Sequence, residues 1–270
     1  MKLAHKLMVA PGSRVRLDKI APDSTPGFAD KEKAQAALER NITRMAELHY
    51  LLYAEGRRSL LVVFQAMDAS GKDGVIRHVM TGLNPQGCQV TSFKAPNSVE
   101  LAHDFLWRVH RNVPSAGKMG IFNRSHYEDV LIVRVHNLVP KPVWSRRYDH
   151  INDFEKLLSA GGTRVLKFYL HISKEEQLQR LRKRLEDPAR QWKVDPADFD
   201  ERKRWDGYME AYEEAMQKCS TRDCPWFIIP ANHKWYRNAA VSQILVETME
   251  EMKMKLPKPK FDISKIKIPE

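Results

Sequence analysis

The sequence is poor in the residue patterns by which several large classes of protein are identified. It has only three cysteines among 270 residues, and no two of them form a C-x-x-C pair. Neither a disulfide framework nor a cysteine-based zinc site is therefore expected. The ten histidines form no H-x-x-x-H or H-E-x-x-H pattern, and G-x-S-x-G is absent, which argues against zinc and serine hydrolases.

Long apolar stretches are also missing. No run approaches the roughly 18 apolar residues that a membrane-spanning helix needs. Lys2, His5 and Lys6 interrupt the N-terminus where a signal peptide would have its apolar core. A soluble, cytoplasmic protein without a membrane partner is the expectation.

Charge of one sign is in excess. The chain has 45 Lys and Arg against 34 Asp and Glu, a formal net charge of +11. This predicts a polyanionic partner, which by composition alone is a nucleic acid, a membrane surface, a nucleotide or an inorganic phosphate chain. The length fits one large domain, or one domain with a mobile insert.

Strand-like and helix-like segments alternate along the chain. Apolar runs bounded by turn residues predict five strands, at 60–65, 89–93, 118–122, 165–171 and 226–230. Helical spacing is found at 31–55, after the first strand to about 80, and at 98–110, 126–136, 142–158, 173–186 and 235–254. This order predicts an α/β fold, with a parallel sheet covered by helices on both faces.

A single domain over 1–270 is expected, with an N-terminal arm over 1–30 and an irregular tail over 256–270. The long helix at 31–55 and the last helix either cover the sheet or form an interface between subunits. A homo-oligomer is the expected assembly.

The segment from 60 to 74 predicts phosphate binding. Its apolar run is typical of a buried parallel strand, and a loop of small residues follows that ends in Gly-Lys before a helical stretch. In such a loop, backbone N–H groups and the helix N-terminus face the anion while the lysine reaches its outer oxygens. The expected phosphate-binding residues are Ala69, Ser70, Gly71, Lys72, Asp73 and Gly74. An ordinary surface Gly-Lys pair is the alternative.

The loop departs from the pattern G-x-x-x-x-G-K-[ST] at two positions. Ala66 replaces the first glycine, Asp73 replaces the residue that would hold Mg²⁺, and Asp68 lies inside the loop. Carboxylates beside a phosphate repel it unless a cation lies between them, so Asp68 and Asp73 predict bound Mg²⁺, with Mn²⁺ as an alternative. Turn formation and helix capping are the simpler explanations of these two acids.

A second polar cluster, residues 123–129, directly follows the predicted strand at 118–122. Ligands of open α/β sheets bind beyond the carboxyl ends of the strands, and Arg124 is suited to clamp a phosphate. Asn123 stands where a Walker-B-type aspartate is expected, so metal binding falls to Asp129 or to the two loop carboxylates. For Glu128 and Asp129 the alternative is the preference of a helix N-terminus for acids.

Between 180 and 204 the chain has nine Lys or Arg residues interleaved with acids, and two prolines divide the segment. A helical lid is expected over about 175–215. Arg180 and Arg184 are spaced i,i+4, which places both guanidinium groups on one helix face, able to close over phosphates. A solvated surface face is the alternative.

Several segments, in this order, resemble the family-2 polyphosphate kinases: 66–74, 82–87, 92–96, 122–130, 192–193 and 234–236. The resemblance covers roughly 60–240. It implies a P-loop kinase fold of three layers, similar to thymidylate kinase, with a helical lid and bound Mg²⁺. It also implies phosphoryl transfer between polyphosphate and nucleotides.

The resemblance implies roles residue by residue. Catalytic roles follow for Asp68, Lys72, Arg124 and Glu128. Polyphosphate contacts follow for three basic residues of the lid, Arg180, Arg184 and Lys193. The Tyr127-Glu128 pair is similar to that of the subgroup accepting both nucleoside mono- and diphosphates.

The expected function is reversible transfer of the terminal phosphoryl of inorganic polyphosphate to AMP or ADP, giving ADP or ATP. One alternative is an ATP-dependent nucleoside-monophosphate kinase, because fold does not determine the donor. Another is a nucleic-acid-binding P-loop ATPase. Nucleic acid is not the expected partner, because the sequence has no recognisable binding motif and its bases are mixed with acids.

Overall fold

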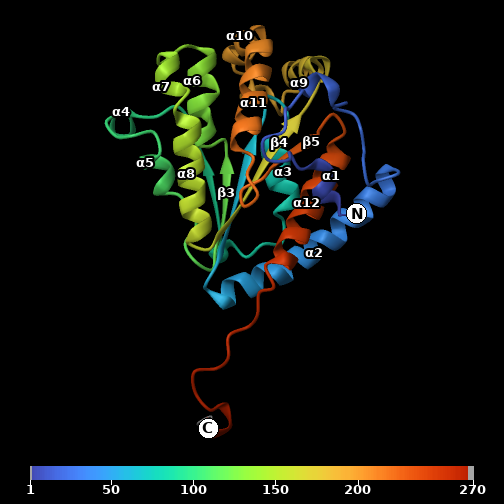
Figure 1. The fold of residues 1–270 in the computed structure, drawn as a ribbon. Coiled ribbons are helices and arrows are strands. Elements are labelled where there is room, and N and C mark those ends of the chain that lie inside the picture. The colour runs from blue at the N-terminus through green and yellow to red at the C-terminus, as the bar shows by residue number, and fades with distance from the viewer. Residues whose placement is uncertain (1, 267–270) are drawn as a thin grey trace.

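The computed structural model describes residues 2–266, and its centre is a five-stranded parallel sheet (Figure 1). The strands are β1 (Ser59–Gln65), β2 (Cys88–Ser92), β3 (Met119–Asn123), β4 (Thr163–His171) and β5 (Trp226–Pro230). Their order across the sheet is β2-β3-β1-β4-β5, and each neighbouring pair is parallel. The α/β class and the five predicted strands are confirmed.

Strand β1 is central and all seven of its residues are buried. Successive side chains of a strand point to opposite faces, so Leu60 and Val62 belong to one apolar cluster while Leu61 and Val63 belong to another. Because helices cover both faces, the strand needs an unbroken apolar run instead of an alternating one.

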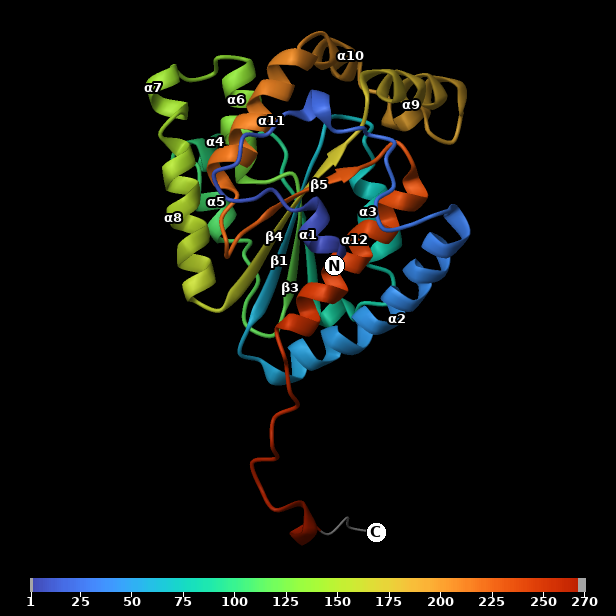
Figure 2. The same cartoon turned by 45° about the vertical axis from the view of Figure 1, so that its right-hand side comes forward.

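Helices lie on both sides of the sheet (Figures 1 and 2). On one side are α2 (Lys31–Glu55), α3 (Lys72–Val79) and α12 (Lys234–Glu251), and on the other α8 (Arg147–Ala160) and α11 (Trp205–Cys219). Helices α2 and α12 pack against each other, and α12 also contacts β5. Among residues 2–266 the structure contains no helix with the length and apolar character needed to cross a bilayer.

Three segments predicted as single helices are interrupted. The segment 98–110 forms α4 (Ser98–Leu101) and α5 (Trp107–His110), and a side-chain oxygen of Asp104 accepts the Leu106 N–H between them. The segment 126–136 begins as a 3₁₀ turn, His126–Val130, and breaks at Leu131 before α6 (Ile132–Val135). Likewise α7 (Lys141–Trp144) is separate from α8. The cap by Asp104 at the first break and the buried Leu131 at the second override the helical spacing.

The N-terminal residues pack onto the body of the molecule (Figure 2). Helix α1 (Leu3–Leu7) contacts α12, where the Glu247 carboxylate accepts the N–H groups of Leu3 and Ala4. The Val9 N–H donates to the Trp226 carbonyl of β5 at 2.8 Å. By contrast, the chain from 256 to 266 is exposed and projects away from the sheet. The last four residues of the predicted tail, 267–270, lie outside the described residues.

Residues 174–203, which we call the lid segment, lie beyond the carboxyl ends of the strands (Figure 1). The segment contains α9 (Lys174–Glu186), a 3₁₀ turn at Gln191–Lys193 and α10 (Pro196–Lys203). The Arg202 guanidinium donates to the Lys174 carbonyl at 2.6 Å and to Gln177 Oε1 at 3.0 Å, which joins α10 to the start of α9.

A buried polar network connects β4, α8 and the turn that follows β3. The Lys167 ammonium and the Glu155 carboxylate form an ion pair that is almost completely buried. Tyr127 OH donates to Glu155 at 2.9 Å and accepts from Lys167 at 3.0 Å, and Lys167 also donates to the Cys219 carbonyl. Burial alone would raise the pKa of Glu155, but Lys167 and His126 outweigh it and lower that pKa.

Replacing Lys167 by Met should leave the Glu155 charge buried and unpaired. Loss of one partner of a buried pair typically costs about 3–5 kcal/mol, and we expect a decrease of that order in the free energy of unfolding measured in urea. The double variant Lys167→Met, Glu155→Leu should be closer to the parent because it removes both charges. A single variant within about 1 kcal/mol of the parent would show that the pair does not stabilise the fold.

Candidate active site

The loop between β1 and α3 has the backbone of a tight strand-to-helix turn. Gly71, the residue before α3, has φ of +99°, a conformation that side-chain-bearing residues rarely adopt. Ala69 is also left-handed, with φ of +62°. The first N–H groups of α3 have no acceptor within their own helix. The turn therefore places a helix N-terminus at the carboxyl edge of the sheet.

Lys72 is the first residue of α3 and is 9% exposed. Its ammonium lies back across the loop and donates to the Ala66 carbonyl at 2.9 Å. Burial lowers the pKa of Lys72 and the nearby Arg124 lowers it further, while Asp68 opposes both effects. An anion bound beside this ammonium would offset the cost of burying its charge.

A cavity of about 510 Å³ opens at this edge of the sheet. Its walls come from the loop, from the segments after β2 and β3, and from the lid segment. It brings together most of the predicted site residues, namely Asp68, Ala69, Gly71, Lys72, Asp73, Arg124, Arg184 and Lys193. Seven further residues line it that carried no predicted role: Ser92, Phe93, Lys94, Ala95, Asn123, Trp192 and Asp198.

Arg124 and Asp68 form an ion pair across the cavity floor. Arg124 has φ of +61°, its N–H donates to the Phe64 carbonyl at 3.0 Å, and its Nη2 lies 2.7 Å from Asp68 Oδ1. Burial opposes the guanidinium charge, but Glu128 and Asp68 outweigh it and raise the pKa of Arg124. The pair keeps one cation and one carboxylate in fixed orientation beside Lys72.

A smaller cavity of about 200 Å³ adjoins the first and shares Asp68, Arg124 and Asp198 with it. Glu128 lines this cavity together with Tyr208 and Tyr212 of α11. Burial raises the pKa of Glu128, although Arg124 and Lys72 oppose the shift. Glu128 thus lies close to the Asp68–Arg124 pair but in a separate compartment from Lys193 and Arg184.

Four predicted residues are outside both cavities. The Asp129 carboxylate pairs with Arg147 at 2.8 Å, and burial raises its pKa to about 6. Ser70 is buried, and among residues 2–266 its Oγ has no hydrogen-bond partner. Gly74 lies within the first turn of α3. The fourth residue is Arg180, which lies outside the cavities although Arg184 lines the main one.

The Arg180 guanidinium supports the loop from behind. It donates to the carbonyls of Ala69 and Ser70 at 3.2 and 2.8 Å, and to those of Ala231 and Asn232 at 2.7 and 3.0 Å. Its Nε pairs with Glu176 at 2.7 Å. The i,i+4 spacing predicts a shared helix face, but Arg180 is 8% exposed while Arg184 reaches the cavity and pairs with Asp198 at 3.0 Å.

The oxygen donors of the main cavity fit a hard divalent cation shared with a ligand. Asp68 and Asp73 both line it, and Asn123 Nδ2 donates to Asp73 Oδ1 at 2.8 Å. Among residues 2–266 there is no group of three or more His, Cys, Asp or Glu placed to hold a metal. Mg²⁺ is usually held by one or two carboxylates together with substrate phosphates and water, and these two carboxylates suit that arrangement.

Some of the lining residues had a signal in the sequence. Lys94 follows the predicted strand at 89–93, so the rule that ligands bind beyond strand ends applies to it as it does to Arg124. Asp198, Tyr208 and Tyr212 carry no such signal, because only the folding of the lid segment and α11 over the sheet brings them to the site.

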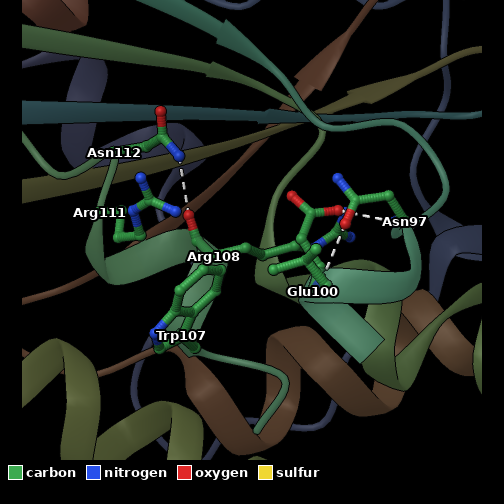
Figure 3. Close-up of a pocket in the computed structure, with 7 residues that line it drawn as sticks. Asn97, Glu100, Trp107, Arg108, Arg111 and Asn112 are labelled. Carbon is green, nitrogen blue, oxygen red and sulfur yellow. Dashed lines mark hydrogen bonds and ion pairs between the residues drawn. The ribbon is translucent and has the colours of Figure 1, made fainter. Parts of the chain in front are cut away.

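A third cavity, of about 190 Å³, lies between α4 and α5 in the connection from β2 to β3 (Figure 3). Arg108 is among the residues that line it (Figure 3). Its Nη1 lies 3.6 Å from Glu100 Oε2 and donates to the Lys94 carbonyl at 2.8 Å. Asn112 donates to the Arg108 carbonyl. These contacts fix the backbone of Lys94, and so one wall of the main cavity.

Comparison with known proteins connects this geometry to a family. A protein of Meiothermus ruber named AMP/ADP-polyphosphate phosphotransferase is 53% identical over 264 residues, covering 97% of this chain and 99% of the relative. An ADP-polyphosphate phosphotransferase of Rhodopseudomonas palustris is 47% identical over 270 residues, covering 95% of this chain and 93% of the relative.

Solved structures agree with the sequence relatives. The crystal structure of polyphosphate kinase 2 from Arthrobacter aurescens TC1 superposes with a TM-score of 0.94 at 45% identity, covering 98% of this chain and 94% of that one. The predicted P-loop kinase fold is therefore confirmed. The model of the family described as Polyphosphate kinase 2 (PPK2) matches residues 28–257, and the chain belongs to the polyphosphate kinase 2 family.

Proposed function

We propose that this protein is a polyphosphate-dependent nucleotide kinase. It transfers the terminal phosphoryl of inorganic polyphosphate to AMP and to ADP, and the reaction is reversible. The observation that carries the proposal is the 510 Å³ cavity in which Lys72, Arg124 and Asp68 meet at the end of a strand–loop–helix unit. The names of the 53% and 47% identical relatives support polyphosphate as donor and AMP and ADP as acceptors.

Phosphoryl transfer requires positioning and charge neutralisation more than covalent participation by the protein. In our proposal Lys72 and Arg124 bind the oxygens of the transferred group, and Arg124 is held in place by Asp68. Asp68 also orients the attacking phosphate of the acceptor. Mg²⁺ bound at Asp68 and Asp73, with Mn²⁺ as a substitute, would supply further neutralisation of phosphate charge.

The lid segment contributes basic side chains and limits the access of water. Arg184 and Lys193 line the cavity opposite the loop, and the Lys193 ammonium lies 4.9 Å from the Trp192 ring centroid. Excluding water strengthens the ionic contacts with phosphate and suppresses hydrolysis of the donor. We assign both residues to polyphosphate binding.

The proposal extends to a cytoplasmic homo-oligomer that does not bind nucleic acid. The three thiols, Cys88, Cys219 and Cys224, are all unpaired, which suits a reducing compartment. Arg180, Arg184, Arg190 and Lys203 of the lid segment pair with acids, and Lys193 lines the cavity. Bases mixed with acids in this way do not suit binding of a nucleic acid.

The direct test is nucleotide chromatography after the protein is mixed with Mg²⁺, long-chain polyphosphate and AMP, without ATP. We expect ADP and then ATP to appear. If polyphosphate gave ATP from ADP but no product from AMP, polyphosphate would remain the donor and AMP would not be an acceptor. No product from either nucleotide, together with activity on AMP plus ATP, would establish an ATP-dependent kinase instead.

Glu128 should decide whether AMP is accepted. In the Glu128→Asn variant we expect kcat/KM for AMP to fall about tenfold more than kcat/KM for ADP, a difference of about 1.4 kcal/mol. AMP is the shorter acceptor and leaves room in the site, and the Glu128 carboxylate orders the water or metal that occupies this room. The Glu128→Gln variant keeps the side-chain length and isolates the effect of charge. Equal losses for AMP and ADP would contradict the assignment.

Polyphosphate affinity should depend on salt. The cavity presents Lys72, Lys94, Arg124, Arg184 and Lys193 to a chain of many charges, and screening weakens such contacts. We expect the KM for long-chain polyphosphate to rise several-fold between about 50 and about 500 mM NaCl, and the KM for ADP to rise less. A KM for polyphosphate that stays constant would rule out an electrostatic groove.

A further inference from the structure

The segment 234–237 begins α12, and its arginine reaches the phosphate-binding loop. Arg237 is 2% exposed. Its Nη1 donates to the Ser70 carbonyl at 3.2 Å, and its Nε and Nη2 donate to Asn238 Oδ1 at 3.1 and 2.9 Å. Arg237 therefore contacts the loop backbone but does not line the main cavity.

The glycines of the loop leave room for this guanidinium. A Cβ atom at Gly71 would overlap Arg237 Nη1, and a Cβ atom at Gly74 would lie 3.3 Å from Nη2. Glycines in such loops are commonly explained by close approach of the phosphate to the backbone. In this protein the Arg237 side chain occupies the space beside Gly71 and Gly74.

The charge of Arg237 is not balanced by a carboxylate. Among residues 2–266 the structure shows no ion pair of Arg237, and its hydrogen-bond acceptors are a carbonyl and a neutral amide. The neighbouring Arg180 donates to the same Ser70 carbonyl at 2.8 Å. Burial, with Arg180, lowers the pKa of Arg237 to about 9, which still leaves it charged at neutral pH.

We propose that Arg237 is a positioning residue for phosphate binding: it fixes the loop backbone at Ser70 and supplies a buried, uncompensated positive charge beneath the phosphate site. A bound polyanion in the main cavity then provides the counter-charge that the protein lacks. This inference rests on the proposed function, because it takes phosphates to be the ligands of the main cavity.

The test is tripolyphosphate binding by isothermal titration calorimetry, in parallel with thermal unfolding of the free protein. We expect Arg237→Gln to weaken tripolyphosphate binding at least about tenfold, and Arg237→Lys, which keeps the charge, to recover most of that loss. Arg44→Gln removes the same charge from an exposed site on α2 and should leave the affinity unchanged. Equal affinities of the parent and Arg237→Gln, or equal losses in both Arg237 variants, would overturn the inference.

A double-variant cycle separates this inference from the proposed function. Alanine is normally preferred to glycine within a helix, but Gly74→Ala places Cβ against Arg237. We therefore expect Gly74→Ala to lower the thermal stability when it is made in the parent protein and to raise it when it is made in the Arg237→Gln variant. Effects of the same sign and size in both backgrounds would show that Arg237 does not constrain the loop. If the parent bound no tripolyphosphate, the proposed function would fail, and this cycle alone would decide whether Arg237 positions the loop.

Discussion

Three side chains bind the backbone carbonyls of the phosphate-binding loop, and the geometry of the whole site depends on them. Gln177 donates to the Asp68 carbonyl at 3.0 Å, Arg180 to those of Ala69 and Ser70, and Arg237 to that of Ser70. Left-handed backbone at Ala69 costs energy unless the surroundings impose it. Because these donors come from α9 and α12, the loop holds its shape through tertiary contacts with distant parts of the chain.

The charge distribution around the loop follows from burial. Lys72 is nearly buried and pairs with a carbonyl, Arg237 has a carbonyl and an amide, and Arg124 is balanced by Asp68. Lys72 and Arg237 are thus buried cations that hydrogen-bond to neutral acceptors, which is unfavourable in the free protein. A phosphate chain is the type of ligand that removes this imbalance, so the cost of burying these cations is recovered on binding.

The extent to which the sequence predicts this site depends on how local the signal is. The strand at 60–65, the loop and Lys72 are adjacent in the chain, so apolar continuity and the Gly-Lys pair are sufficient to locate them. Arg180 and Asp129 show the opposite case. Helical spacing favours Arg180 as a site residue, and the position after a strand favours Asp129. Both are held away from the cavity by partners from remote segments, the loop carbonyls for Arg180 and Arg147 for Asp129. The helix break at Asp104 is a different case, because its side chain accepts the N–H of Leu106 two residues on, a local contact that helical spacing alone does not reveal.

The attachment of the lid segment has a consequence for how a long ligand enters. Gln177 and Arg180 fasten α9 to the loop, Arg202 fastens α10 to α9, and Glu201 of α10 bonds His136 beyond α6. Rotation of the helix pair as a unit would break its contacts with the loop and with His136 at once. The connection over 187–195 has fewer ties to the core, and its Trp192 is 78% exposed. Displacement of this short tip alone would leave these contacts intact, so the loop, Lys72 and Arg124 would stay assembled around a long ligand while the tip moves.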